Sequence, residues 1–550
     1  MSSTEVHFTP SYSTASSSLR SLQGTTGDGT SGRSNGNLRS AAAVPTKNKT
    51  IIQGFEWHVP ADNQHWKRLE SVVPVLAHLG VNALWIPPAC KGFGPDSVGY
   101  DIYDLYDLGE FEQKGCVATK YGTKQELVSL ARAAEAHGVG MVFDVVISHK
   151  AGADECEDVR AIKVESFNRN CEIGDFEDIQ AWTKFEYKAR NNEYSSFVWH
   201  KDHFSGVDYD EKTKTAGIVR RLEGKNWASD VDPERGNYDY LMFANIDLGH
   251  PEVRQELFSW AEWLGAQLPI RGLRLDAIKH MSTGFVKEFV KQAKQVWGDD
   301  CLLLGEYWVQ ESDFLVNYAE DMGCDVQLYD IRLVHNFKDI SWAQDPDLRT
   351  IFEGTLAQTR PDLSLTFVVN HDTQEGQTSE TLVAPWFIPL AYSIILLHAN
   401  GGSPVVFYGD LYGSFGPMGE RPSGTYEPAD HGRRLIPSMM LARQAYAYGL
   451  QSQYFDEADC IGFTRHGDAC FSNHAGLAVL MTSRCEMAVK RMFVGEIHTG
   501  EHWTDLLGEV QGSIEIDSEG WGLFAAAPRS VSVWAASDAA GRHDIDSFAL

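Results

Sequence analysis

Short apolar segments alternate with amphipathic segments along most of this chain, and this alternation restricts the fold more than any other feature. Residues 65–79 and 124–137 carry apolar side chains at helical spacing, and a glycine follows at or next to the end of each segment. Apolar runs at 82–87 and 140–147 follow the pattern of strands. This order is typical of a parallel sheet with helices packed on it. We predict eight strands, at 50–57, 82–87, 140–147, 270–278, 302–307, 326–330, 365–370 and 404–408.

Eight strand–helix units over about 390 residues predict an α/β fold of the (β/α)₈ TIM-barrel type, which tolerates insertions. A doubly wound open sheet is the alternative, but no glycine-rich phosphate-binding motif follows any predicted strand. The third connection is about a hundred residues long, and we interpret it as an inserted subdomain because such long connections are seldom without structure. Alternating runs near the end predict an antiparallel β-sandwich. The predicted boundaries are 1–49 for a disordered Ser/Thr/Gly-rich arm, 50–147 and 245–441 for the barrel, 148–244 for the subdomain, 442–537 for the β-sandwich and 538–550 for a tail.

The charge of the chain limits its partners. Lys and Arg number 47 against 76 Asp and Glu, a formal net charge of −29 over 550 residues. Such a surface repels phosphate backbones and anionic lipids, and no apolar run reaches the ~18 residues of a membrane span. We therefore expect a neutral substrate, no nucleic acid and no membrane as partners, and a monomer.

The cysteines and the first residues bear on the compartment. The nine cysteines have no metal-type spacing. Cys156 and Cys171 are able to pair, but we favour free thiols, which fit a reducing compartment. The segment 1–49 lacks the charged region and apolar run of a signal peptide. We therefore predict an intracellular, cytoplasmic protein.

Charged and histidine side chains gather at the carboxyl ends of four predicted strands, where a barrel carries its reactive groups. Arg274 and Asp276 share one face of a strand, because residues two apart point the same way. A structural ion pair would explain these two alone. A carboxylate kept ionised by a guanidinium, as a nucleophile must be, explains the whole set better. The set is Asp144, His149, Arg274, Asp276, Lys279, His280, Glu306, His371 and Asp372.

These residue types suit the cleavage of an acetal. One carboxylic acid must protonate the leaving oxygen, and a second carboxylate must attack or steady the oxocarbenium-like centre. Asp276 beside Arg274 suits the second role. Glu306 lies in an apolar run that should raise its pKa and keep it protonated. His149 and His371 are able to donate hydrogen bonds to sugar hydroxyls. Asp372 is able to bind a pair of hydroxyls more tightly as positive charge develops on the sugar ring.

Four ordered segments resemble those of the alpha-amylase family of glycoside hydrolases (family 13): 144–149, 272–280, 305–306 and 369–372. The resemblance extends over about 51–534 and is strongest to bacterial liquefying amylases and intracellular fungal alpha-amylases. The segments that carry this second resemblance are 53–57, 65–69, 85–89, 98–101, 103–111 and 238–242.

The resemblance implies a retaining mechanism on internal α-1,4-glucosidic bonds of starch, glycogen or maltooligosaccharides. Asp276 would be the nucleophile, Glu306 the general acid/base and Asp372 the transition-state stabiliser. Asp144 has a second interpretation as a structural hydrogen-bond partner. The implied substrate-binding residues are Tyr100, Asp144, His149, Arg274, Lys279, His280 and His371.

The resemblance also implies calcium between the barrel and the inserted subdomain, but several expected ligands are replaced. Val369 likewise stands where an acidic residue is common, which bears on local hydrogen bonding more than on mechanism. Calcium prefers several carboxylates, and we predict that its site is weak or lost and that no cofactor is required. The replaced positions are Ser148, Ala228, Asn245 and Gly249, and the remaining candidates are Asp239, Asp247 and His280.

Two other functions fit part of the pattern. A 4-α-glucanotransferase would use the same catalytic residues, with a sugar hydroxyl in place of water. A non-catalytic carbohydrate-binding relative is a further alternative, but Asp276, Glu306 and Asp372 are all in place.

Overall fold

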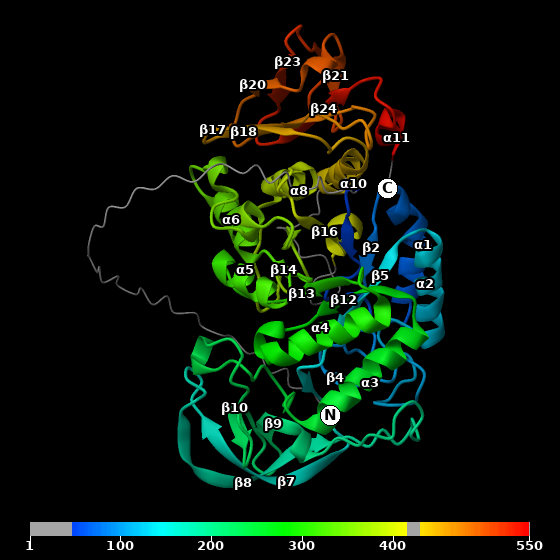
Figure 1. The fold of residues 1–550 in the computed structure, drawn as a ribbon, viewed down its shortest axis with the longest axis vertical. Coiled ribbons are helices and arrows are strands. Elements are labelled where there is room, and N and C mark those ends of the chain that lie inside the picture. The colour runs from blue at the N-terminus through cyan, green and yellow to red at the C-terminus, as the bar shows by residue number, and fades with distance from the viewer. Residues whose placement is uncertain (1–46, 415–429, 549–550) are drawn as a thin grey trace, which may run out of the picture.

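The computed structural model describes residues 47–414 and 430–548. At its centre is a closed barrel of eight parallel strands in the order β1-β16-β15-β14-β13-β12-β5-β2 (Figure 1). All eight predicted strands contribute to it, so the predicted barrel is confirmed and the open sheet is excluded. The arm predicted at 1–49 lies almost wholly outside the described residues. The barrel strands are β1 Ile51–Gln53, β2 Ala83–Trp85, β5 Gly140–Val145, β12 Ile270–Leu275, β13 Leu302–Gly305, β14 Val326–Tyr329, β15 Ser364–Phe367 and β16 Ser403–Phe407.

Helices cover the barrel because each has an apolar face to bury. In α4 this face carries Phe285, Phe289 and Ala293, and the Ser282 hydroxyl caps the first turn by accepting from the Phe285 N–H. By contrast α8 is buried on all sides, since it packs against β15 and β16, against α10 and against two strands of the C-terminal sheet, β19 (Leu477–Thr482) and β24 (Val531–Ala536). The helices are α1 His65–His78, α2 Lys124–Ala136, α3 Pro251–Gln267, α4 Thr283–Trp297, α5 Ser312–Asp321, α6 Ile331–Trp342, α7 Leu356–Thr359, α8 Ile388–Leu397, α9 Tyr408–Tyr412 and α10 Asp430–Ala445, with 3₁₀ turns η1 Lys201–His203, η2 Glu234–Gly236, η3 Ile278–His280, η4 Leu348–Thr350, η5 Pro385–Phe387 and η6 Glu496–His498.

The long third connection forms a separate antiparallel sheet, which we call domain B. It leaves the barrel after β5 and returns before α3, and it lies at the opposite end of the molecule from the C-terminal domain (Figure 1). Its strand order is β6-β11-β9-β10-β7-β8, and a separate two-stranded sheet, β3 with β4, precedes it in the chain. These strands are β3 Lys91–Gly92, β4 Ile102–Asp104, β6 His149–Lys150, β7 Glu155–Val164, β8 Glu172–Lys184, β9 Phe204–Asp210, β10 Thr215–Leu222 and β11 Ala244–Ile246.

The C-terminal domain has the predicted antiparallel character. A six-stranded sheet, β17-β18-β19-β24-β21-β22, packs against the pair β20-β23 around a core that includes Met492, Phe524 and Trp534. The strands are β17 Gln451–Glu457, β18 Cys460–Arg465, β19 Leu477–Thr482, β20 Ala488–Phe493, β21 His502–Asp505, β22 Ser513–Glu515, β23 Trp521–Ala526 and β24 Val531–Ala536.

The segment predicted as a tail is ordered over part of its length. Helix α11, Arg542–Ser547, lies within it. Arg542 is buried, and its guanidinium donates to the carbonyls of Thr504 and Ala535. These bonds and the burial of Ile545 fix the helix against the sheet, which the sequence pattern did not indicate.

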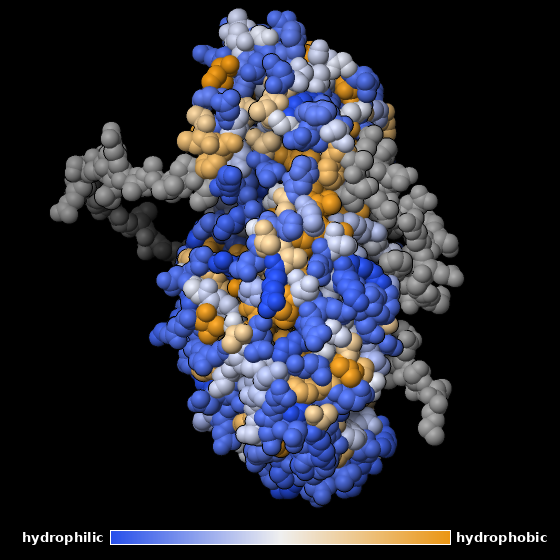
Figure 2. Space-filling model, turned by 90° about the vertical axis from the view of Figure 1, so that its right-hand side faces the viewer, coloured by the Kyte–Doolittle hydropathy of each residue, from blue (hydrophilic) through white to orange (hydrophobic). Residues whose placement is uncertain are grey.

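The face in Figure 2 is mostly hydrophilic, with hydrophobic residues in small scattered groups. Within 47–414 and 430–548, no helix has both the length and the apolar character needed to cross a membrane. All nine cysteines lie in these ranges and are free, so the expectation of free thiols is confirmed.

Candidate functional site

Arg274 is the centre of a carboxylate cluster at the carboxyl ends of neighbouring barrel strands. Its Nη1 donates to Asp144 Oδ1 at 2.8 Å and to Asp276 Oδ1 at 2.7 Å, and its Nη2 donates to Glu306 Oε2 at 2.5 Å. The Arg274 side chain is fully buried, so these charge-assisted bonds form away from bulk water. One guanidinium therefore fixes three acids that the sequence assigned to three different strands.

Asp144 is held by donors on both of its oxygens. Oδ1 accepts from Arg274, and Oδ2 accepts from Trp85 Nε1 and Tyr100 Oη, each at 2.9 Å. Its side chain has no exposed surface. This geometry corresponds to the second interpretation of Asp144, as a structural hydrogen-bond partner.

Asp276 and Glu306 differ in how easily they ionise. The pKa of Asp276 is raised to about 6, because burial and the charges of Asp144 and Asp372 outweigh Arg274. The pKa of Glu306 is raised to about 7, again mainly by burial, although Arg274 and the Ala277 N–H lower it. At neutral pH Asp276 is thus mostly a carboxylate, while Glu306 holds a proton for a large fraction of the time.

The backbone after Asp276 is arranged to reach Glu306. Ala277 adopts a left-handed conformation with φ of 50°, which costs a residue with a Cβ about 1 kcal/mol. In this conformation its N–H donates to Glu306 Oε2 at 3.1 Å. Glu306 therefore accepts a backbone N–H from this loop in addition to the guanidinium of Arg274 in β12.

Asp372 is carried by a tight turn after β15. The Asn370 side-chain oxygen accepts from the N–H groups of Asp372 and Thr373 at 2.9 and 2.8 Å, and Thr373 Oγ1 accepts from the Asn370 N–H. The Asp372 side chain is 29% exposed. Burial, followed by the charge of Glu306, raises its pKa to about 7.

Parallel rings stand beside the acids. The rings of Tyr100 and His371 lie 5.0 Å apart and 4° from parallel, and Trp57 lies parallel to both. His371 Nδ1 is 3.2 Å from Gln53 Nε2 and so accepts its N–H, which leaves the proton on Nε2, 3.3 Å from Asp372 Oδ2. Flat faces of this kind suit stacking on neutral sugar rings.

The remaining predicted residues already have partners within the protein. His149 Nε2 contacts the Tyr100 carbonyl at 2.7 Å and its Nδ1 contacts Ser148 Oγ at 2.9 Å, so the expected donation to a sugar would require one of these bonds to break. Lys279 Nζ donates to Glu234 Oε2 at 2.5 Å and to the Trp308 carbonyl. His280 Nδ1 contacts the carbonyl of Tyr238, a residue of domain B, at 2.8 Å.

Several residues that hold the site together were not predicted from the sequence. Tyr329 accepts from Arg274 Nε at 3.2 Å, Trp85 donates to Asp144, and Gln53 donates to His371. Each of the three is the last residue of its barrel strand. Their position at strand ends, rather than their charge, is the signal that could have found them.

The residues expected near calcium form a hydrogen-bonded group at the junction of domain B and the barrel. Asp239 is buried, accepts from the Ala228 N–H at 3.1 Å and has a pKa raised to about 7 by burial. Asp247 pairs with Lys225 at 2.7 Å, and Asn245 Nδ2 donates to Ser205 Oγ.

Few side-chain oxygens of this group remain for a cation. Asn245 Oδ1 is buried and has no hydrogen-bond donor among the described residues. Asp239 contributes its carboxylate, one oxygen of which already accepts from the Ala228 N–H. Ser148 Oγ is bonded to His149, and Gly249 offers no side chain. Calcium takes six to eight oxygens, so this ligand set is poor for it.

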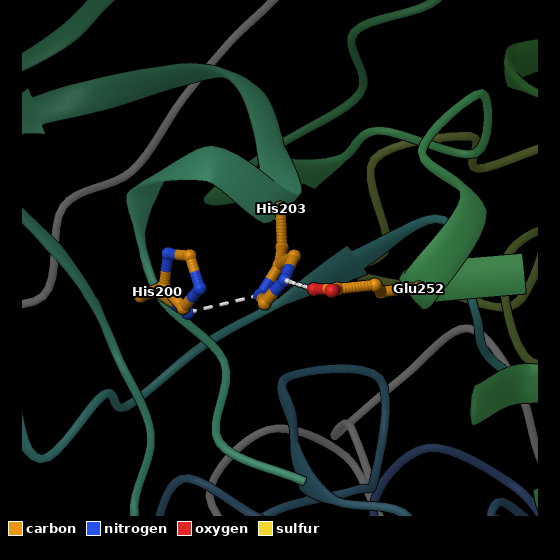
Figure 3. A group of neighbouring side chains, drawn as sticks. All are labelled: His200, His203 and Glu252. Carbon is orange, nitrogen blue, oxygen red and sulfur yellow. Dashed lines mark hydrogen bonds and ion pairs between the residues drawn. The ribbon is translucent and has the colours of Figure 1, made fainter. Parts of the chain in front are cut away.

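A group of His200, His203 and Glu252 has ligand atoms within 4.8 Å of one another (Figure 3). His203 Nδ1 accepts the His200 N–H at 3.1 Å, so the neutral ring carries its proton on Nε2, which faces Glu252 Oε2 at 3.3 Å. A protonated Nε2 has no lone pair for a metal. We therefore interpret the group as a hydrogen-bonded link between η1 of domain B and α3 of the barrel.

Comparisons with known proteins agree with this geometry. Residues 64–434 match the family model described as the alpha amylase catalytic domain, and residues 487–535 match the alpha-amylase C-terminal model. An alpha-amylase of Bacillus licheniformis is 43% identical over 90% of this chain and 95% of its own length. The cytoplasmic alpha-amylase of Escherichia coli is 38% identical over 89% of this chain and 99% of its own length.

Solved structures show the same fold. The structure of an Anoxybacillus alpha-amylase superimposes with a TM-score of 0.59 at 17% identity, covering 89% of this chain and 97% of that one. The catalytic-domain model spans more than half of the chain, and the identity to full-length relatives exceeds what chance resemblance gives. The chain belongs to the alpha-amylase family, glycoside hydrolase family 13.

Proposed function

We propose that this protein is an endo-acting, retaining glycoside hydrolase that cleaves internal α-1,4-glucosidic bonds of starch, glycogen or maltooligosaccharides. The observation that carries the proposal is the contact of one buried guanidinium, Arg274, with the carboxylates of Asp276 and Glu306 at 2.7 and 2.5 Å. Such a pair supplies the nucleophile and the acid that acetal cleavage needs. The named alpha-amylases at 38% and 43% identity support starch hydrolysis as the activity.

In the proposed mechanism Asp276 attacks the anomeric carbon while Glu306 gives its proton to the leaving oxygen. The glycosidic C–O bond breaks and an ester links the sugar to Asp276. Glu306, now a carboxylate, takes a proton from a water molecule that attacks the same carbon and releases Asp276. Two inversions at one carbon retain its configuration. Asp372 and the Nε2–H of His371 would bind the hydroxyls of the reacting sugar more tightly as its ring gains positive charge.

The other side chains have supporting roles in this proposal. Tyr100 and Trp57 would stack on the sugar bound at the cleavage point. Asp144 would hold the hydroxyl of Tyr100, and His149 would hold its backbone carbonyl. Lys279 and His280 would meet the leaving-group side. Both are bound to domain B, Lys279 through Glu234, so domain B would form one wall of that side.

The glucanotransferase alternative shares every step up to the ester and is not favoured, because relatives that span about nine-tenths of the chain are named alpha-amylases. Product analysis on maltoheptaose separates the two: shorter products support hydrolysis, and products longer than the substrate support transfer. A non-catalytic role is not favoured either, since Asp276, Glu306 and Asp372 are all present.

Isosteric variants test the assigned roles. Asp276→Asn and Glu306→Gln should each lower kcat on maltoheptaose by about 10²–10⁴-fold. On an α-maltosyl fluoride, whose leaving group needs no proton, Glu306→Gln should keep rapid release of fluoride in the first turnover, whereas Asp276→Asn should lose it. Glu353→Gln changes an exposed glutamate in the same way and serves as the control. Equal rates for Glu306→Gln and the parent on maltoheptaose would contradict the proposal.

We also infer that the protein acts in the cytoplasm as a monomer. Nine free cysteines support a reducing compartment, and a relative of 38% identity is named a cytoplasmic enzyme. Cell fractionation tests the cytoplasmic location, and recovery of the protein in the culture medium would contradict it. Light scattering tests the second, where a mass near 61.2 kDa supports a monomer and twice that mass contradicts it.

A further inference from the structure

At the junction of domain B with the barrel, an ammonium group contacts Asp247, one of the residues that the family resemblance implies as calcium ligands. Lys225 lies between β10 and η2, and its Nζ is 2.7 Å from Asp247 Oδ2. The same ammonium donates to the carbonyl of Asp202. The side chains of Lys225 and Asp247 are 17% and 23% exposed, so most of the pair is removed from water.

The groups around this pair present hydrogen atoms to the nearby oxygens. The Gly249 N–H donates to Asp247 Oδ1 at 3.0 Å, so both oxygens of Asp247 have donors. The Ala228 N–H donates to Asp239 Oδ2, and Asn245 Nδ2 donates to Ser205 Oγ at 2.8 Å. Hydrogen-bond donors carry partial positive charge and repel a divalent cation at the positions they occupy.

We propose that Lys225 is the built-in cation of this junction, and that it fixes domain B to the barrel without a divalent metal. An ammonium is a compact charge with three donors, which suits one carboxylate and neighbouring carbonyls. The junction lies next to Ser148, which follows β5, and includes the turn that leads to α3, since the Ile246 N–H donates to the Ser148 carbonyl and the His250 N–H to the Asp247 carbonyl. The loops around the catalytic acids would therefore keep their positions at any calcium concentration.

Thermal unfolding tests the proposal without reference to activity. The parent should unfold at the same temperature in millimolar calcium and in excess EGTA, and elemental analysis after gel filtration in calcium should find no bound calcium. A fall of several degrees in EGTA, or one calcium per chain, would overturn the proposal.

Variants of Lys225 test the role of the ammonium itself. Lys225→Met should lower the Tm by about 2–4 °C, in calcium and in EGTA alike, because Asp247 then lacks its cation. Lys225→Arg should restore most of the loss. Lys212→Met is the control, since it removes an exposed ammonium bonded to a carbonyl of the same domain. A Tm of Lys225→Met equal to that of Lys212→Met would overturn the proposal.

A gain-of-function variant tests the same idea from the other side. Asn245→Asp and Ser205→Asp, combined with Lys225→Met, place two new carboxylates at hydrogen-bonded neighbouring positions of the junction and remove the competing cation. Calcium should then raise the Tm of this variant by several degrees, and the variant should retain calcium through gel filtration. If the same carboxylates in a chain that keeps Lys225 give an equal calcium effect, the ammonium does not occupy the metal position and the proposal fails.

Discussion

Arg274 and Asp144 face each other across neighbouring strands β12 and β5, where they are register partners, and a 2.8 Å bond joins Nη1 to Oδ1. Neither side chain has exposed surface. Asp144 thus fixes the position of the Arg274 guanidinium, which in turn binds Asp276 and Glu306. Burial raises the pKa of both acids most; beyond it, Arg274 lowers these pKa values and the negative charge of Asp144 raises them.

Removing the charge of Asp144 should therefore move the pH dependence of activity. In Asp144→Asn the pKa of Glu306 should fall, so this acid loses its proton at a lower pH. The alkaline limb of the kcat/KM profile should therefore move to lower pH. The same change should lower the free energy of unfolding by about 1–3 kcal/mol, since a buried donor loses its charged acceptor. The pH profile and the urea midpoint measure the two effects. An alkaline limb that stays in place would contradict the assigned coupling.

The parent enzyme should have a narrow pH optimum. Asp276 must be ionised, with a pKa of about 6, and Glu306 must be protonated, with a pKa of about 7. The value of kcat/KM should peak between these pH values and fall about tenfold for each unit beyond them. Stopped assays on maltoheptaose measure this profile. A flat response up to pH 9 would show that another group provides the proton.

The raised pKa values should also cost stability. The folded-state pKa of Glu306 lies above its unfolded value, so the folded chain holds more protons between about pH 4 and 7 and its stability falls as the pH rises through this window. Glu306→Gln removes that titration. Its Tm relative to the parent should be higher at pH 8 than at pH 5, by the equivalent of about 1–3 kcal/mol. A relative Tm that is independent of pH would contradict the shift.

Tyr329→Phe should impair catalysis without harming the fold. It removes the hydroxyl that accepts from Arg274 Nε at 3.2 Å and frees the guanidinium to tilt. We expect kcat/KM to fall about three- to tenfold, the effect of one hydrogen bond. Tyr318→Phe is the matched control, because the Tyr318 hydroxyl is buried with no partner among the described residues. Equal kcat/KM values for the two variants would contradict the role of Tyr329.

Asp230 should matter for stability rather than catalysis. This residue of domain B caps α4 of the barrel, since its Oδ2 accepts from Ser282 Oγ and the Gly284 N–H at 2.9 and 2.8 Å. Asp230→Ala should lower the free energy of unfolding by about 1–2 kcal/mol. Asp175→Ala, an exposed position in β8, is the control. Denaturant titration measures both.

The barrel could be predicted because its strands are short, apolar and separated by strongly amphipathic helices such as α4. Domain B could not be resolved into strands. In β7 and β8, many side chains between Glu155 and Lys184 are exposed and charged, so the alternation that marks a half-buried strand is absent. In the C-terminal domain, β17 carries no clear pattern for the same reason, since it is an edge strand with little burial.

The acids of the site could be predicted from their place at strand ends and from the family resemblance, but their hydrogen bonds could not. Periodicity locates Arg274 and Asp276 on one face, yet it does not reveal that Glu306 shares the same guanidinium. Nor does it reveal that both nitrogens of His149 are already bonded. These facts depend on how separate strands meet in three dimensions, which a one-dimensional pattern does not contain.

Domain B starts and finishes at adjoining points of the scaffold, because its first strand, β6, pairs with its last, β11. Inserted sequence of any length can be exchanged between these two points without changing the strand pairing on either side. The chemical centre and the wall beside it can therefore diversify independently, so that substrate preference evolves through a replaceable module.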